Sequence, residues 1–252
     1  MTRRAGRERA GAFLAEGAQA VREALASPGA RVREVFATAD PRHDELVASA
    51  RAASVPVRRV TDRAAASLSE TVTPQGLVAV CDVPATTVAE ALAGRPPLVA
   101  VLVGIADPGN AGTVVRVADA AGAGAVVFAG DTVDAYNGKA VRASTGSLFH
   151  LPVARDRDVP AVFAACREAG LRLVGADGYA ADDLDAAEAD LAAPTAWVFG
   201  SEAHGLSEDV TAQLDATLRV PLYGRAESLN LATAAAVCLY ASARAQHRGA
   251  RG

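Results

Sequence analysis

The sequence is poor in cysteine and in aromatic residues, and it has almost no lysine. The three cysteines are far apart and belong to no CxxC or Cys/His pattern, which argues against a disulfide framework and against a zinc site. We interpret Cys81, Cys166 and Cys238 as small core residues in a reducing compartment. No apolar run is long enough for a signal peptide or a membrane span. We therefore expect a cytoplasmic protein that binds neither a membrane nor a metal.

The sequence has the composition of a globular protein, and its charge is distributed unevenly along the chain. Of the 252 residues, 51% are hydrophobic, which is ample for one large α/β domain or two smaller ones. Residues 1–63 and 221–252 carry net charges of +4 and +3, whereas residues 151–220 carry −8. A basic end fits contact with phosphates, but arginine replaces lysine everywhere except at Lys139. The charge pattern alone leaves nucleic acid binding open.

Residues 1–83 predict a small α/β unit. Helix-like patterns at 14–26, 43–53 and 61–70 alternate with strand-like runs at 32–37, 55–60 and 77–81. Residues 84–97 hold three prolines, two threonines and one glycine around one short helical pattern, which is the composition of a linker. We expect the domain boundary there, with a second domain at 98–252.

The second domain is expected to hold a mainly parallel sheet. Its apolar runs are short and unbroken, at 98–103, 125–129, 171–175, 196–199 and 217–220. Helix-like segments alternate with them at 110–121, 160–169, 207–214 and 229–245. This pattern is typical of strands that are buried on both faces.

Three short segments of this domain join a strand-like run to a helix-like one. They are Asp107-Pro108-Gly109-Asn110-Ala111-Gly112, Phe199-Gly200-Ser201-Glu202 and Glu227-Ser228-Leu229-Asn230-Leu231-Ala232. Taken singly, each could be only a turn or a helix cap. Together they place glycine and small polar or acidic residues at the carboxyl ends of strands, where open α/β sheets bind ligands. The conjunction indicates a nucleotide-like site.

The same segments, with Arg116, Gly205-Leu206 and Val220-Pro221-Leu222, resemble in order the three motifs of the SpoU or TrmH branch of the SPOUT RNA methyltransferases. This resemblance covers residues 98–245. Residues 1–83 resemble the substrate-binding domain of the ribosomal-RNA members, a unit like a small ribosomal protein, through Phe13-Leu14-Ala15-Glu16-Gly17 and Thr73-Pro74-Gln75-Gly76-Leu77. Residues 136–146 are also similar to the family.

The resemblance implies a fold and an activity. Family members fold the C-terminal α/β domain into a trefoil knot, bind S-adenosylmethionine there, act as homodimers and methylate a ribose 2′-hydroxyl of RNA. We therefore expect a small α/β substrate-binding domain, a knotted SPOUT methyltransferase domain, a homodimer and an RNA substrate, with ribosomal RNA favoured by the N-terminal domain. Sequence periodicity alone argues against a knot, because threaded chains are very rare.

The resemblance also assigns the functional residues. Catalytic roles are implied for Asn110, Arg116, Glu202, Ser228 and Asn230. The cofactor would be held by Ser144, Thr145, Gly146, Phe199, Gly200, Ser201, Glu202, Gly205, Val220, Leu222, Ser228 and Leu229. RNA would be bound by Arg3, Arg4, Arg7, Arg9, Lys139 and Arg142.

Arg116 is sometimes assigned as the general base in this family, but a guanidinium is effectively always protonated in proteins. We expect it to bind the target phosphate and to stabilise the developing alkoxide. Its apolar neighbours Val114, Val115 and Val117 indicate a partly buried position between subunits. The proton acceptor stays open, with the imidazole of His204 as one candidate.

Alternative functions stay open at this point. The substrate could be transfer RNA, or the chain could be a nonenzymatic RNA-binding protein that keeps the fold. A nicotinamide dinucleotide enzyme is a third alternative, but Gly122-Ala123-Gly124 precedes a strand instead of opening a helix. The presence of every polar motif residue favours the methyltransferase.

Overall fold

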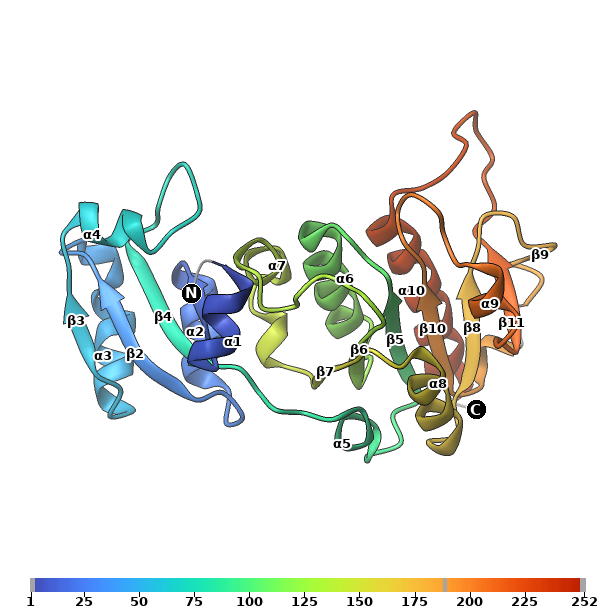
Figure 1. The fold of residues 1–252 in the computed structure, drawn as a ribbon, viewed down its shortest axis with the longest axis horizontal. Helices are drawn as coiled ribbons and strands as arrows, with labels where there is room; N and C mark the ends of the chain where they lie inside the picture. The colour runs from blue at the N-terminus through green and yellow to red at the C-terminus, as the bar shows by residue number, and fades with distance from the viewer. Residues whose placement is uncertain (1–2, 188–189, 250–252) are drawn as a thin grey trace. The chain divides into compact units, whose positions relative to one another are not determined.

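The chain forms two compact units (Figure 1). The computed structural model describes residues 3–187 and 190–249. The first unit contains the residues up to Ala85 together with Asp134–His150, and the second contains Thr86–Val133 and the residues from Leu151 onward. The chain therefore passes from one unit to the other three times, at 85–86, 133–134 and 150–151.

The first unit is built on a four-stranded sheet of order β1-β4-β2-β3. Strand β4 is antiparallel to β1 and β2, and β3 is parallel to β2. Helices α2 and α3 pack on this sheet. The elements are α1 (Arg4–Ala10), β1 (Ala12–Glu16), α2 (Ala18–Ala26), β2 (Val32–Ala37), η1 (Pro41–His43), α3 (Asp44–Ala52), β3 (Val57–Arg59), α4 (Asp62–Ser67), β4 (Leu77–Asp82), α7 (Gly138–Ser144) and η2 (Ser147–Phe149).

The helix predicted at 14–26 begins later than predicted, at Ala18. Residues 12–16 form strand β1, and Gly17, with a φ of 94°, separates this strand from α2. Leu14-Ala15-Glu16 favours a helix by intrinsic propensity, but pairing with β4 buries Phe13 and Ala15 in the core. Tertiary burial thus outweighs local propensity here.

Residues 134–150 complete the first unit, although they lie in the middle of the second in sequence. The ring of Phe13 lies 4.8 Å from that of Tyr136 and 5.9 Å from that of Phe149, measured between centroids. The Ser27 hydroxyl donates to the carbonyl of Phe149 over 2.9 Å. The buried Arg7 pairs with Asp134 over 2.7 Å. These contacts connect both ends of the segment to residues 7–27.

The second unit contains a seven-stranded parallel sheet of order β7-β6-β5-β10-β8-β11-β9. The parallel sheet confirms the fold class that the apolar runs predict. The elements are α5 (Val88–Leu92), β5 (Leu98–Val103), α6 (Pro108–Ala120), β6 (Ala125–Ala129), β7 (Val153–Asp156), α8 (Val159–Glu168), β8 (Arg172–Ala176), β9 (Asp182–Asp183), η3 (Asp190–Ala192), β10 (Thr195–Phe199), α9 (Glu208–Thr211), β11 (Ala216–Arg219) and α10 (Leu231–Gly249).

Helices cover both faces of this sheet (Figure 1). Val99 and Val101 of β5 face a core that includes Phe163 of α8 and also Leu92 of α5. Because side chains alternate along a strand, the intervening residues point to the opposite face. There the Trp197 indole donates to the Ser242 hydroxyl of α10 over 2.9 Å. Helix α5 lies within the predicted linker 84–97, and its apolar side makes it part of this core.

The three cysteines are buried, as the sequence indicates. Burial raises the pKa of Cys166 to about 11 and the pKa values of Cys81 and Cys238 to about 12. Within the described ranges, no group of three or more His, Cys, Asp or Glu side chains could hold a metal ion. None of the described helices is long and apolar enough to cross a membrane.

Candidate active site

The three motif segments of the second unit follow parallel strands. Residues 107–112 come after β5, residues 200–205 after β10, and residues 220–230 after β11. Strand β10 pairs directly with β5, and its carboxyl end therefore lies beside that of β5. The sheet thus places the first two motifs next to each other at one edge.

A hydrogen-bond network joins all three motifs through their side chains. Glu202 accepts from the Asn110 side-chain amide over 3.1 Å. The Asn230 amide in turn donates to the side-chain oxygen of Asn110 over 3.0 Å. Three of the five predicted catalytic residues are therefore connected by hydrogen bonds. Asn110 contacts both Glu202 and Asn230 and so links them.

Two residues of these motifs also cap helices. The Asp107 carboxylate accepts from the backbone N–H of Asn110 over 2.8 Å at the start of α6. The Asn230 side-chain oxygen accepts from the N–H groups of Ala232 and Thr233, over 2.9 and 3.3 Å, at the start of α10. Asn230 thus acts as a cap with its oxygen and as a member of the network with its amide.

The environment of Glu202 defines its role. Its carboxylate also accepts from the backbone N–H groups of Ala106 and Asp107, both over 3.2 Å. Burial by itself would raise the pKa of Glu202, but the hydrogen bonds from Asn110 and from the backbone outweigh it and lower the pKa. Glu202 is therefore ionised at neutral pH and a poor proton acceptor. Its position suits anchoring of the loop before α6.

Arg116 and Ser228 lie outside this network. Arg116 projects from α6 as an exposed side chain, while Val114 and Val115 are buried. It has no hydrogen-bond or ion-pair partner in the part of the chain that the structure describes. The partial burial expected for Arg116 is thus absent within a single chain. Ser228 is likewise exposed, and its hydroxyl has no partner among the described residues.

The turn after β10 depends on glycine. The backbone of Ser201 exchanges two hydrogen bonds with that of Gly205, over 3.0 and 2.8 Å. A Cβ on Gly200 would lie 2.2 Å from the Gly205 carbonyl, and Gly205 has a φ of 65°. The Phe199 side chain is fully buried against Trp197, so only its backbone could contact a ligand. His204 is exposed, and its backbone N–H donates to the Ser201 hydroxyl.

The loop before α10 offers unpaired backbone. Residues 220–229 form no backbone hydrogen bond to any residue of 3–187 or 190–249, and residues 222–228 are exposed. Val220 is half-buried, and Leu222 presents apolar surface beside the free N–H and C=O groups. Such a mixture fits a nucleoside, whose edge needs hydrogen bonds and whose faces are apolar. The loop thus presents the kinds of groups that a nucleoside ligand needs.

The remaining predicted cofactor residues belong to the first unit. Ser144 is buried, and its hydroxyl donates to the carbonyl of Val141 over 2.8 Å. Thr145 is exposed, with a φ of 53°. Gly146 has a φ of 99° and lies against Glu23 of α2, whose side chain would be 2.4 Å from a Cβ at this position. Ser144, Thr145 and Gly146 thus belong to the first unit, whereas the loops at 200–205 and 220–229 belong to the second.

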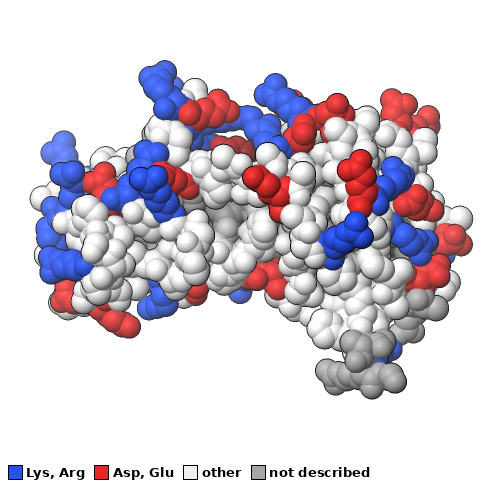
Figure 2. Space-filling view, turned by 90° about the horizontal axis from the view of Figure 1, so that it is seen from below, with Lys and Arg blue, Asp and Glu red and all other residues white. Residues whose placement is uncertain are grey.

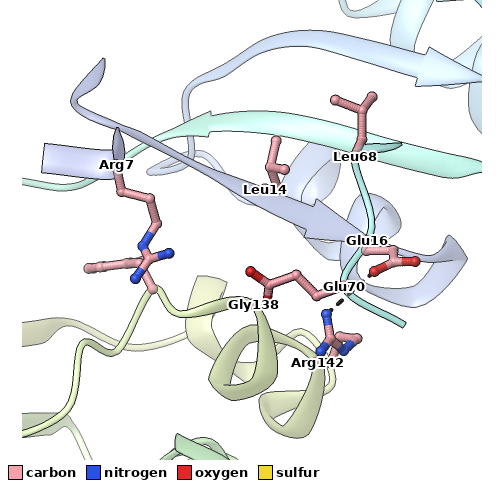
Figure 3. Close-up of a pocket in the computed structure, with 8 residues that line it drawn as sticks. Arg7, Leu14, Glu16, Leu68, Glu70, Gly138 and Arg142 are labelled. Carbon is pink, nitrogen blue, oxygen red and sulfur yellow. Dashed lines mark hydrogen bonds and ion pairs between the residues drawn. The ribbon is translucent and has the colours of Figure 1, made fainter. Parts of the chain in front are cut away.

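Several of the predicted RNA-binding residues form ion pairs within the described chain. Arg7 is only 4% exposed and pairs with Asp134, while Arg142 pairs with Glu16 over 3.4 Å. Both line a small pocket of the first unit together with Leu14, Leu68, Glu70, Tyr136 and Gly138 (Figure 3). Arg4 pairs with Glu8, whereas Arg3, Arg9 and Lys139 are exposed.

Other arginines of the first unit are more accessible. Arg31 and Arg42 are each 85% exposed and Arg58 is 68% exposed, although each has an acidic partner. Figure 2 shows basic side chains gathered at the left of the drawn face, and acidic ones more frequent at its right. These residues are not among the RNA contacts predicted from the sequence, although they contribute to the excess of arginine in residues 1–63.

Comparison with known proteins identifies the family. The family model described as SpoU rRNA Methylase matches residues 97–240, and the one described as RNA 2'-O ribose methyltransferase substrate binding matches residues 14–87. The 23S rRNA (guanosine(2553)-2'-O)-methyltransferase RlmP of Bacillus subtilis is 36% identical over 93% of this chain and 89% of its own length.

Two solved structures resemble this chain closely. The SpoU methyltransferase AviRb from Streptomyces viridochromogenes has a TM-score of 0.85 and 31% identity, covering 98% of this chain and 94% of its own. The AdoMet-bound rRNA methyltransferase from Sinorhizobium meliloti has a TM-score of 0.83 and 28% identity, covering 96% and 91%. These likenesses confirm the predicted methyltransferase fold with its N-terminal substrate-binding domain. The chain belongs to the SpoU rRNA methylase family.

Proposed function

We propose that this protein transfers a methyl group from S-adenosylmethionine to a ribose 2′-hydroxyl of ribosomal RNA, in the cytoplasm. The observation that carries the proposal is the network of Asn110, Glu202 and Asn230, which joins the three family motifs at one edge of a parallel sheet. The named relatives support ribosomal RNA as the substrate, since RlmP carries a 23S rRNA specificity in its name.

In this proposal, the turn at 200–205 and the loop at 220–229 hold the cofactor, largely through backbone groups. Bound S-adenosylmethionine supplies an already activated methyl group, so this chain's residues have to align it, position the ribose and exclude water. Glu202 fixes the start of α6 through Ala106 and Asp107. By family resemblance, Ser144, Thr145, Gly146 and Ser228 also serve the cofactor.

Arg116 is the proposed electrostatic catalyst. Its exposed guanidinium has all its donors available, which suits a phosphate and a developing alkoxide at the same time. It cannot take the proton, because a guanidinium stays protonated. Glu202 is an unsuitable acceptor as well, since three hydrogen bonds stabilise its ionised form and its pKa is lowered. The proton would leave to substrate phosphate, to water or to His204.

We also propose a homodimer and, from the family resemblance alone, a C-terminal trefoil knot. Helices α6 and α10 contact each other, and the Tyr240 hydroxyl donates to the carbonyl of Ala120 over 3.2 Å. Val237 and Tyr240 present apolar surface from α10 to solvent, and Arg116 is exposed on α6. A second copy covering this face would give Arg116 the partial burial that the single chain lacks.

Cofactor binding is the first test of the proposal. Calorimetric titration of the full chain should show S-adenosylmethionine, or its demethylated product, binding at one site per chain. NAD should not compete, because the chain lacks a glycine fingerprint that opens a helix. Absence of heat at millimolar cofactor would rule out the proposed site.

The substrate is tested with RNA. Mapping of 2′-O-methylation in total RNA, with and without the gene, should show one position in ribosomal RNA that depends on it. A dependent position in transfer RNA would support the alternative substrate, and no dependent position would support a nonenzymatic role. Binding to the RNA fragment should weaken steeply as salt rises, since phosphate neutralisation releases counterions. A flat response to salt would argue against phosphate contacts.

A further inference from the structure

The loop at residues 220–229 is fixed at both ends. Before it, the Arg219 guanidinium donates to the carbonyl of Ala180 over 2.7 Å and pairs with Asp183 over 3.5 Å. After it, Asn230 caps α10 and contacts Asn110. Between these anchors, the loop makes one side-chain hydrogen bond to the rest of the described chain. The Tyr223 hydroxyl donates to the Asp185 carboxylate over 2.8 Å.

Hydrogen bonds fix the backbone on both sides of Asp185. The N–H of Leu184 donates to the carbonyl of Arg219 over 3.0 Å, and the side chain of Leu184 is buried. The N–H of Ala186 donates to the Asp183 carboxylate over 2.9 Å. The carboxylate that receives the Tyr223 hydroxyl is therefore presented from a fixed position.

The Tyr223 side chain contributes little besides this hydrogen bond. It is 87% exposed, so its ring buries almost no apolar surface. A hydrogen bond to a charged acceptor is stronger than a neutral one. Removing the Tyr223 hydroxyl alone would thus remove the hydrogen bond between the middle of the loop and Asp185, and it would leave the packing of the core unchanged. A substitution of Tyr223 by Phe therefore tests this hydrogen bond without a change in buried surface.

We propose that the hydrogen bond between Tyr223 and Asp185 is a latch that preorganises residues 220–229 for S-adenosylmethionine. This inference rests on the proposed function, because that proposal assigns the loop to the cofactor. A flexible loop has to be ordered when a ligand binds, and this ordering reduces affinity. The latch restricts the loop beforehand, so Tyr223 acts as a positioning residue for the cofactor and not as a catalytic one.

The test is calorimetric titration of the full chain with S-adenosylmethionine. Tyr223→Phe and Asp185→Asn should each weaken binding by about three- to tenfold, the usual range for one hydrogen bond. The double variant should bind no more weakly than either single one, because both substitutions break the same bond. Tyr179→Phe is the matched control: Tyr179 is 99% exposed, and its hydroxyl makes no hydrogen bond within the described residues.

A second measurement needs no cofactor. Arg225 is exposed within the loop, so trypsin can cut after it, and the new end at Ala226 can be followed by mass spectrometry. Tyr223→Phe should speed this cut, and Tyr179→Phe should leave its rate unchanged. Unchanged cleavage and unchanged affinity in Tyr223→Phe would overturn the latch. So would tighter binding by Tyr223→Phe, or additive effects in the double variant. If the parent chain binds no cofactor while the cleavage result holds, the proposed function fails and the latch stands as a loop attachment.

Discussion

Arg116→Ala is expected to lower the turnover of RNA methylation by about two to three orders of magnitude, the usual scale for losing a donor that stabilises the transition state. Cofactor affinity should barely change, because Arg116 lies outside the network that joins the motif loops. The thermal stability of the single chain should also be unchanged, since the side chain has no hydrogen-bond or ion-pair partner in the described chain. Single-turnover methylation at saturating RNA and cofactor is the measurement.

Two further variants make the result specific. Arg116→Lys should recover little activity, because an ammonium keeps the charge but lacks the planar fork that engages phosphate and alkoxide together. Arg157→Ala removes another exposed arginine of the second unit and should stay near the parental rate. Dimerisation should be checked by light scattering in each variant. Near-parental rates for both Arg116 variants would exclude the proposed mechanism.

The second large effect is expected at Asn230, where two substitutions separate two roles. Asn230→Ala removes both the cap of α10 and the amide that donates to Asn110. It should lower stability by about 1 kcal/mol, and weaken cofactor binding or turnover by about 1–3 kcal/mol. Asn230→Asp keeps a cap acceptor at the helix N-terminus but loses the donor to Asn110. It should therefore melt near the parental temperature and still be impaired in methylation.

The comparison of these two variants decides the role of the network. Thermal melting reports the cap, and titration with S-adenosylmethionine followed by single-turnover kinetics reports the site. If Asn230→Asp methylates RNA like the parent, Asn230 is only a helix cap and the contact with Asn110 is incidental. Equal loss of stability in both variants would show instead that the two roles cannot be separated.

The sequence predicted the central part of the fold well, because buried parallel strands leave a local pattern. The apolar run at 98–103 coincides with β5, and the run at 125–129 coincides with β6. Short strands at the sheet edge leave no such pattern. Strand β9 has two residues, Asp182 and Asp183, and no apolar signal.

For the site, the sequence predicted which residues belong to it but not which of them contact one another. Local motifs, through their resemblance to a family, named Asn110, Glu202 and Asn230 together. Their pairing depends on β10 lying beside β5, which is a property of the strand order and not of spacing along the chain. Arg7 and Arg142 show the opposite case. Their charges were counted as available to RNA, but partners distant in sequence, Asp134 and Glu16, engage them.

The triple passage of the chain between the units constrains the order of folding during synthesis. Domains usually fold N-terminal first as they leave the ribosome. The sheet of the first unit is complete at Asp82, but Phe13 lacks its aromatic partners and Arg7 lacks Asp134 until residues 134–150 have been made. A buried arginine without its carboxylate is strongly unfavourable. The first unit therefore reaches its native state only after β5, α6 and β6 of the second have emerged, and the two units mature together.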